Sequence, residues 1–76
     1  MPELTEVDSS MIHSLGYDGE ANEMFVRFRS KGHPGALWKY AGVPENVFNA
    51  VKNNGSVGGA FLRHVRDRYT ATKLSS

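Results

Sequence analysis

Apolar and polar positions alternate most cleanly in the stretch EMFVRFRS, residues 23–30. Met24, Val26 and Phe28 fall on one side of an extended chain, and the side chains between them fall on the other. This two-residue period predicts a half-buried antiparallel strand with one face toward a core. Turn-forming stretches flank it, GYDGEANE before it and SKGHPG after it, so neighbouring strands are expected on both sides.

Two such neighbours are predicted. The first covers about residues 10–17, a short apolar-rich segment that ends at glycine and aspartate. Its alternation is imperfect, because Ile12 and Leu15 are three residues apart, which indicates a β-bulge near residues 13–14. The other is ALWKYAG, residues 36–42, where large aromatic side chains share one face.

Helical signals follow the last of these strands. In VPENVFNAVKNNG, Pro44 suits a first helical turn, and Gly55 is expected in the left-handed conformation that ends a helix. Ser56 is a candidate N-cap for a final helix over about residues 58–70. The glycine-rich stretch between the helices is either a plain turn or a phosphate-binding nest; it lacks the lysine of a P-loop.

These elements predict an α+β fold: a three-stranded antiparallel meander followed by two helices packed on one sheet face. The chain is short enough for a single domain, residues 1–76, with an ordered core over about 7–70. Residues 1–8 and 72–76 are expected to be frayed ends.

The aromatic residues of the third strand are the main question about the core. A domain this small needs the burial of its large rings, each worth roughly 1.5–3 kcal/mol. Trp38 and Tyr40 are therefore expected on the helix-covered face, at the rim of the core where their polar atoms find partners.

The amino-acid composition excludes several classes of protein. The chain has no cysteine, so disulfides and thiolate metal sites are excluded. No apolar run approaches the ~20 residues of a membrane span, and the acidic N-terminal stretch does not resemble a signal peptide. The default expectation is a cytoplasmic protein without a metal or another cofactor.

Charge is distributed unevenly along the chain. Residues 1–23 hold six acidic side chains and no lysine or arginine, a charge of −6. Residues 24–76 hold nine basic side chains against two acidic ones, a charge of +7. The basic part is suited to a polyanion or an acidic protein, and the alternative is that the two parts attract each other in the fold.

Three stretches, DSSMIHSLGYD, WKYAGVPENVF and SVGGAFLRHVRDRY, together resemble the KTSC domain, over about residues 7–69. That family is named for a segment of some lysyl-tRNA synthetases and also occurs as single-domain bacterial and phage proteins. The positions that match its recurring motifs are Ser9, Ser10, Ile12, Gly16, Tyr17, Asp18, Trp38, Tyr40, Val43, Pro44, Ser56, Gly58, Phe61 and Tyr69.

The resemblance implies the fold more strongly than it implies an activity. RNA binding is the function usually suggested for the family. Trp38 stands where the family's central motif has a tyrosine, so a role that needs a hydroxyl group would be lost here, whereas packing or stacking would be kept.

Two surfaces are candidates for binding. The sheet face away from the helices would combine an exposed ring with cations, as single-stranded nucleic acid requires, and would also suit a protein contact or no role. The final helix would form a basic ridge in which Arg63 and Arg66 share a face, although a solvated helix face has the same pattern. The candidate binding residues are Phe25, Arg27, Arg29, Lys39, Arg63, Arg66 and Arg68.

Catalysis has little support in the sequence. The three histidines are scattered without the spacing of metal ligands, and Ser9 is better explained as a residue that bonds the local backbone at a strand start. No catalytic or metal-binding residues are therefore expected. The hypothesis is a small binding module for RNA, and the alternative is an adaptor or inhibitor, such as a phage-encoded one, that docks on a larger host protein.

Overall fold

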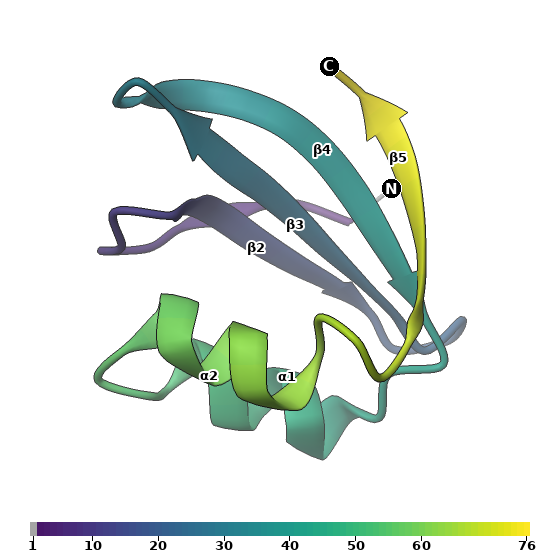
Figure 1. Cartoon of the computed structure of the whole chain (residues 1–76). Helices are drawn as coiled ribbons and strands as arrows, with labels where there is room; N and C mark the ends of the chain where they lie inside the picture. Colours follow the sequence, from purple (N-terminus) through teal and green to yellow (C-terminus); the bar gives the residue numbers. More distant parts are fainter. Residues whose placement is uncertain (1) are drawn as a thin grey trace.

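A computed structural model describes residues 2–76 and shows a twisted antiparallel sheet above two short helices (Figure 1). The sheet has five strands in the order β1-β2-β3-β4-β5. The elements along the chain are β1 (Thr5–Glu6), β2 (Ile12–Asp18), β3 (Glu23–Ser30), β4 (His33–Ala41), α1 (Glu45–Lys52), α2 (Val57–His64) and β5 (Thr70–Ser75).

The α+β class is confirmed, but the three-stranded meander is wrong because the sheet has two additional edge strands. β1 pairs with β2, and β5 returns after the helices to pair with β4. Residues 5–6 and 70–75 are thus paired strands and not frayed ends; residue 1 lies outside the described residues. All side chains of both strands are exposed, so burial leaves no alternating pattern in their sequences.

The predicted hairpins are otherwise confirmed. β2, β3 and β4 pair in sequence, and the register of the β2–β3 ladder shifts between Ile12 and Ser14, where a bulge is expected. In the turn after β2, the Asp18 Oδ1 atom accepts hydrogen bonds from the backbone N–H groups of Glu20 and Ala21. This local bonding is the reason aspartate favours turns.

Both helices end earlier than predicted. Pro44 is the N-cap of α1, and Asn53, not Gly55, is its C-cap, with a φ of −92°. Ser56 occupies the N-cap position of α2, as expected, but its side chain makes no capping hydrogen bond. The final helix ends at His64 and does not reach residue 70, because the chain turns back there to join the sheet.

The helices cover one face of the sheet, as predicted, and the core lies between the two layers (Figure 1). Phe61 of α2 meets Phe28 and Tyr40 edge to face, with ring centroids 5.5 and 5.3 Å apart. Tyr40 is 5 % exposed and belongs to the core, whereas Trp38 is partly buried against it; the expected helix-covered face is confirmed for both, and the place at the rim for Trp38 only. The buried cluster is Ile12, Leu15, Met24, Val26, Tyr40, Val43, Phe48, Val51, Val57, Ala60, Phe61 and Val65.

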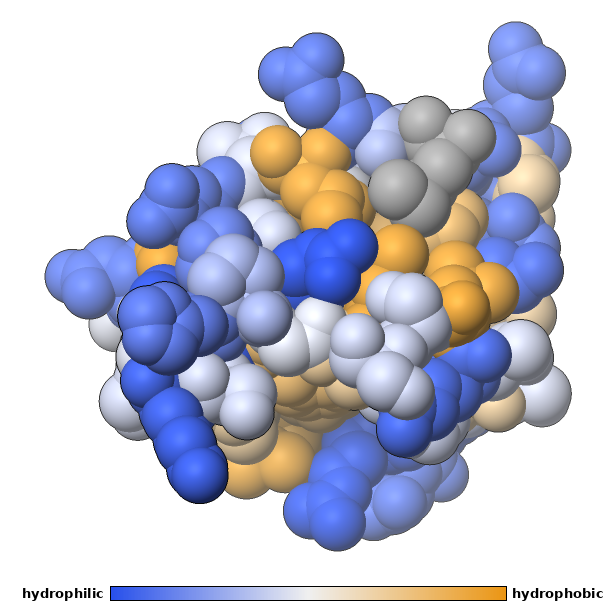
Figure 2. Space-filling model, turned by 90° about the horizontal axis from the view of Figure 1, so that it is seen from above, coloured by the Kyte–Doolittle hydropathy of each residue, from blue (hydrophilic) through white to orange (hydrophobic). Residues whose placement is uncertain are grey.

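The opposite face of the sheet is not the exposed aromatic surface that the alternation predicted. Phe25 is 4 % exposed and Leu37 is 5 % exposed. Phe25 lies opposite Gly16, and a Cβ atom on Gly16 would come within 2.7 Å of the Leu4 Cδ2 atom. The N-terminal segment therefore lies over this part of the sheet. Viewed from above, apolar side chains gather near the centre and hydrophilic ones around them (Figure 2).

Candidate functional site

The two hairpin arginines are engaged in hydrogen bonds to the backbone. The Arg27 Nη1 atom donates to the carbonyl oxygen of Gly35 at 2.8 Å, across the β3–β4 hairpin. Arg29 donates to the carbonyl oxygens of Ser9 at 2.8 Å, Val7 at 3.3 Å and Ile12 at 3.4 Å. Arg29 thereby fastens the segment before β2 to the third strand, which is a structural role.

The remaining members of the expected sheet platform are also occupied. The Lys39 Nζ atom lies 3.3 Å from Glu23 Oε2, and both side chains are partly buried. The Phe25 ring is buried, so the expectation of an exposed stacking ring on this face is wrong. Alternation along a strand tells which face a side chain takes, but not whether another segment covers that face.

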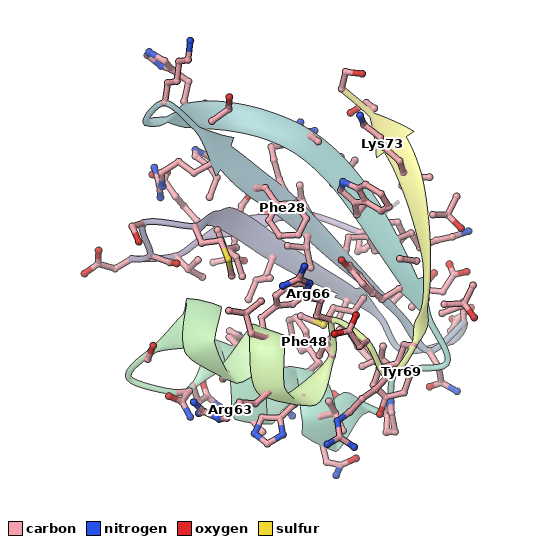
Figure 3. The ribbon with its side chains drawn as sticks, viewed as in Figure 1. Phe28, Phe48, Arg63, Arg66, Tyr69 and Lys73 are labelled. Atoms are coloured by element: carbon pink, nitrogen blue, oxygen red, sulfur yellow. The ribbon has the colours of Figure 1, made fainter. Side chains whose placement is uncertain are left out.

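The C-terminal arginines are exposed. Arg63 belongs to the last turn of α2, while Arg66 and Arg68 lie in the turn that follows. Arg68 Nε donates to the carbonyl oxygen of Arg63 at 3.1 Å, and within residues 2–76 no arginine forms an ion pair with a carboxylate. Because α2 ends at His64, Arg63 and Arg66 do not share a helix face; Figure 3 shows Arg66 pointing toward the sheet and Arg63 away from it.

A groove opens where Arg66 points. Two helices of eight residues each cover only part of the five-stranded sheet, and β4 and β5 rise away from them (Figure 1). The groove has a volume of about 510 Å³, within the range of about 300–1,000 Å³ typical of ligand pockets. Its lining residues are Met11, Phe28, Trp38, Tyr40, Phe61, Leu62 and Arg66.

Strand β5 supplies a second cation beside this groove. Lys73 is the register partner of Trp38 in the β4–β5 ladder, so both side chains lie on the same face of the sheet. Figure 3 shows Phe28, Arg66 and Lys73 around the opening, from the sheet, the turn after α2 and β5. The groove therefore has aromatic walls and a cationic rim.

The tyrosine of the groove keeps its proton at ordinary pH. Burial raises the pKa of the Tyr40 hydroxyl above its usual value of 10.0; the Arg66 guanidinium lowers that pKa, and the Asp67 carboxylate raises it. The net direction is upward. Tyr40 is therefore a neutral hydroxyl group beside the groove, and the charge there comes from Arg66 and Lys73.

The glycine-rich stretch between the helices borders a different hollow, of about 360 Å³, together with residues 8–11. The Ser9 Oγ atom accepts hydrogen bonds from the N–H groups of Met11 and Ile12, both at 3.2 Å, which confirms its local structural role. Asp8 also lines this hollow, and its negative charge disfavours a phosphate there. The plain turn is thus the better interpretation.

The described residues hold neither a metal-binding cluster nor a membrane-spanning helix. Across residues 2–76 there is no group of three or more His, Cys, Asp or Glu side chains that could hold a metal ion. Neither α1 nor α2 has the length and apolar character that a membrane-crossing helix needs.

Comparison with known proteins identifies the family. The family model for the KTSC domain matches residues 8–69, most of the chain. This chain belongs to the KTSC domain family. Its fold is similar to the crystal structure of a KTSC domain protein from Yersinia pestis, with a TM-score of 0.88 and 27 % identity, covering 99 % of this chain and 100 % of that one. A Stutzerimonas stutzeri (strain A1501) protein, described as uncharacterized, is 40 % identical over 55 residues, 72 % of each chain.

Sequence reasoning placed the strand aromatics Phe28, Trp38 and Tyr40 correctly on the helix-covered face but missed the groove itself. The sequence did contain a signal for the groove. The core-facing positions of two strands carry more large rings than two short helices can cover. Strand β5, which brings Lys73 beside the groove, left no such signal, and it lies beyond residue 69, where the family match ends.

Proposed function

We propose that this KTSC domain is a small non-enzymatic module that binds single-stranded nucleic acid, RNA above all, through its exposed C-terminal cations. The observation that carries the proposal is the set of arginines at and after the end of α2, which are exposed and make no ion pair with a carboxylate within the described residues. Exposed guanidinium groups that are not paired with a carboxylate are suited to bidentate contacts with phosphates. The contact residues are Arg63, Arg66, Arg68 and Lys73.

The position of the acidic segment supports the proposal. If the carboxylates of residues 1–23 neutralised the C-terminal arginines, no positive surface would remain for a polyanion. Of these carboxylates, Glu23 pairs with Lys39 at 3.3 Å, and Glu6 lies 4.0 Å from the His13 Nε2 atom. Lys39 and His13 both lie in the sheet, at β4 and β2.

The hairpin cations have a smaller part in this proposal than in the sequence-based hypothesis. Arg27, Arg29 and Lys39 each have a partner within the fold, so they add to the long-range field without being primary phosphate contacts. Phe25 takes no part, because a ring that is 4 % exposed cannot stack on a base.

The test is a titration of fluorescently labelled single-stranded RNA at several salt concentrations. We expect the logarithm of the affinity to fall linearly with the logarithm of salt between about 50 and about 200 mM, as phosphate contacts release counterions. Arg66→Gln should reduce that slope by about one unit. Lys52→Gln, which removes the same charge from the exposed end of α1, is the matched control and should leave the slope unchanged.

Absence of binding at the lowest salt concentration would overturn the proposal. So would binding whose affinity is insensitive to salt, or a slope that Arg66→Gln and Lys52→Gln reduce equally. The last result would mean that the affinity follows net charge and not the C-terminal surface.

A second candidate function is an adaptor or inhibitor that docks on a larger protein, and one observation favours it. β5 is an edge strand with six exposed residues, and an extended segment of another protein can pair with such an edge. Phe25 and Leu37 are buried, so the sheet face away from the helices offers no apolar contact at these positions. Recovery of one stoichiometric partner after nuclease treatment, lost when β5 is disrupted, would favour this function over RNA binding.

A further inference from the structure

The aromatic walls of the groove are held in place by the core. Phe61 contacts Phe28 on one side and Tyr40 on the other, both edge to face, so three rings fix one another. Trp38 lines the same groove but belongs to none of the ring pairs found in residues 2–76. Among the four rings that line the groove, the indole is therefore the one that belongs to no such pair.

The rim of the groove is charged, although its walls are apolar. Arg66 lines the groove directly, and Lys73 lies opposite Trp38 in the β4–β5 ladder. Residues directly opposite in an antiparallel pair have Cβ atoms about 4.5–5.5 Å apart. A ligand on the indole would thus lie within reach of a lysine from β5 and an arginine from the turn after α2.

We propose that this groove takes one unpaired nucleobase of a single strand, stacked on Trp38, while Arg66 and Lys73 hold phosphates of the same strand. This inference rests on the proposed function and adds to it the form of the nucleic acid. Bases in a duplex are already stacked on both faces, so only a single strand can offer one to the indole.

Charge complementarity favours a base over an apolar protein side chain as the occupant. A purely apolar occupant would leave two cations at the rim without a counter-charge. A nucleotide supplies both parts of the match, a flat ring for the apolar walls and a phosphate for the rim.

The experiment uses the single tryptophan of the chain as its reporter. The full-length protein is titrated with a short single-stranded RNA and with an abasic oligomer of the same length and backbone charge. Binding is measured by anisotropy, and Trp38 emission is recorded in parallel. We expect the RNA to quench Trp38, and the abasic oligomer to bind about 5- to 150-fold more weakly without quenching, which is the effect of losing one stacked base.

The outcomes separate this inference from the proposed function. Equal affinity for the two oligomers, with Trp38 emission unchanged, would overturn the proposal of a nucleobase stacked on Trp38. It would leave the charge-driven binding intact. Failure of both oligomers to bind overturns both proposals. Quenching of Trp38 emission by an apolar peptide, but not by RNA, would assign the groove to a protein partner. This result would also overturn the proposal of a stacked nucleobase.

Substitutions at Trp38 and Lys73 protect the test against a simple loss of folding. Trp38→Phe keeps a stacking ring and should retain most of the preference for RNA over the abasic oligomer, whereas Trp38→Leu should abolish it. Lys73→Gln changes an exposed side chain and should weaken binding of both oligomers, with Lys52→Gln as the matched control. A Trp38→Leu variant that is folded by circular dichroism and keeps the full preference would contradict the proposal.

Discussion

Lys73 is the register partner of Trp38, so the last strand of the chain places an ammonium group on the same face as the only indole. The ladder between β4 and β5 therefore does two things at once. It brings β5 beside the aromatic groove, and it places a second cation, Lys73, next to a groove whose lining already includes Arg66.

The first prediction concerns the contribution of β5. A chain that ends at Tyr69 should unfold at a lower denaturant concentration, and its Trp38 emission should shift to longer wavelength, because the neighbouring strand no longer shields the indole. Removal of Ser76 alone, which lies outside the strand, is the control. Unchanged stability and emission in the shorter chain would show that residues 70–75 are frayed after all.

Arg29 is predicted to stabilise the fold. Its guanidinium donates to three carbonyl oxygens of the segment that leads into β2. Arg29→Met should lower the free energy of unfolding by about 1–3 kcal/mol, as expected for hydrogen bonds from a charged donor. Lys39→Met removes an ion pair between partly exposed groups and should cost no more than about 1 kcal/mol. Equal effects in urea denaturation would argue against this difference.

Gly16 is predicted to be intolerant of any side chain. A Cβ atom there would lie 2.7 Å from Leu4 Cδ2 and 2.9 Å from the Glu3 carbonyl oxygen, and the backbone atom cannot easily move away. Gly16→Ala should destabilise the protein by about 1–3 kcal/mol. Gly55→Ala is the matched control, because a Cβ atom at Gly55 meets no atom within 4 Å. Similar unfolding midpoints for the two variants would contradict the close approach.

Stability should fall at alkaline pH through Tyr17. Its hydroxyl donates to the Val43 carbonyl oxygen at 2.6 Å, and burial, with the Glu45 and Asp18 carboxylates, raises its pKa above 10.0. The folded state thus retains the proton that the unfolded state loses near pH 10, so stability is present below that pH and decreases as pH rises through the folded-state pKa. Tyr17→Phe should cost about 1 kcal/mol at neutral pH. It should also lose less stability than the parent between neutral and alkaline pH; an identical dependence would exclude Tyr17 as its source.

Local periodicity was sufficient for the elements that bury side chains. The alternation of residues 23–30 matches β3, and the spacing of Ile12 and Leu15 indicated the bulge in β2. Helix periodicity predicted the wrong end for α2. Val65 and Tyr69 continue its apolar stripe, although the chain leaves the helix after His64. The pairing of β5 with β4 is a long-range interaction that a local pattern does not contain.

The same distinction between local and long-range signals applies to the candidate site. The exposed arginines could be recognised from composition and position. The covering of Phe25 depends on a segment near the N-terminus, and the position of Lys73 beside the groove depends on a strand with no buried side chain. Neither of these two arrangements can be inferred from the local sequence around the residues involved.

The central claim is that a single strand binds over the groove between α2 and the sheet, next to β5. Its most direct test is a nuclear magnetic resonance titration of the isotope-labelled protein with single-stranded RNA, in which the Trp38 indole N–H signal is followed. The prediction is that the largest shifts fall on Trp38, Arg66 and Lys73 and grow with RNA concentration until saturation. An unmoved indole signal, with shifts confined to α1 or to the turn between β3 and β4, would contradict the claim.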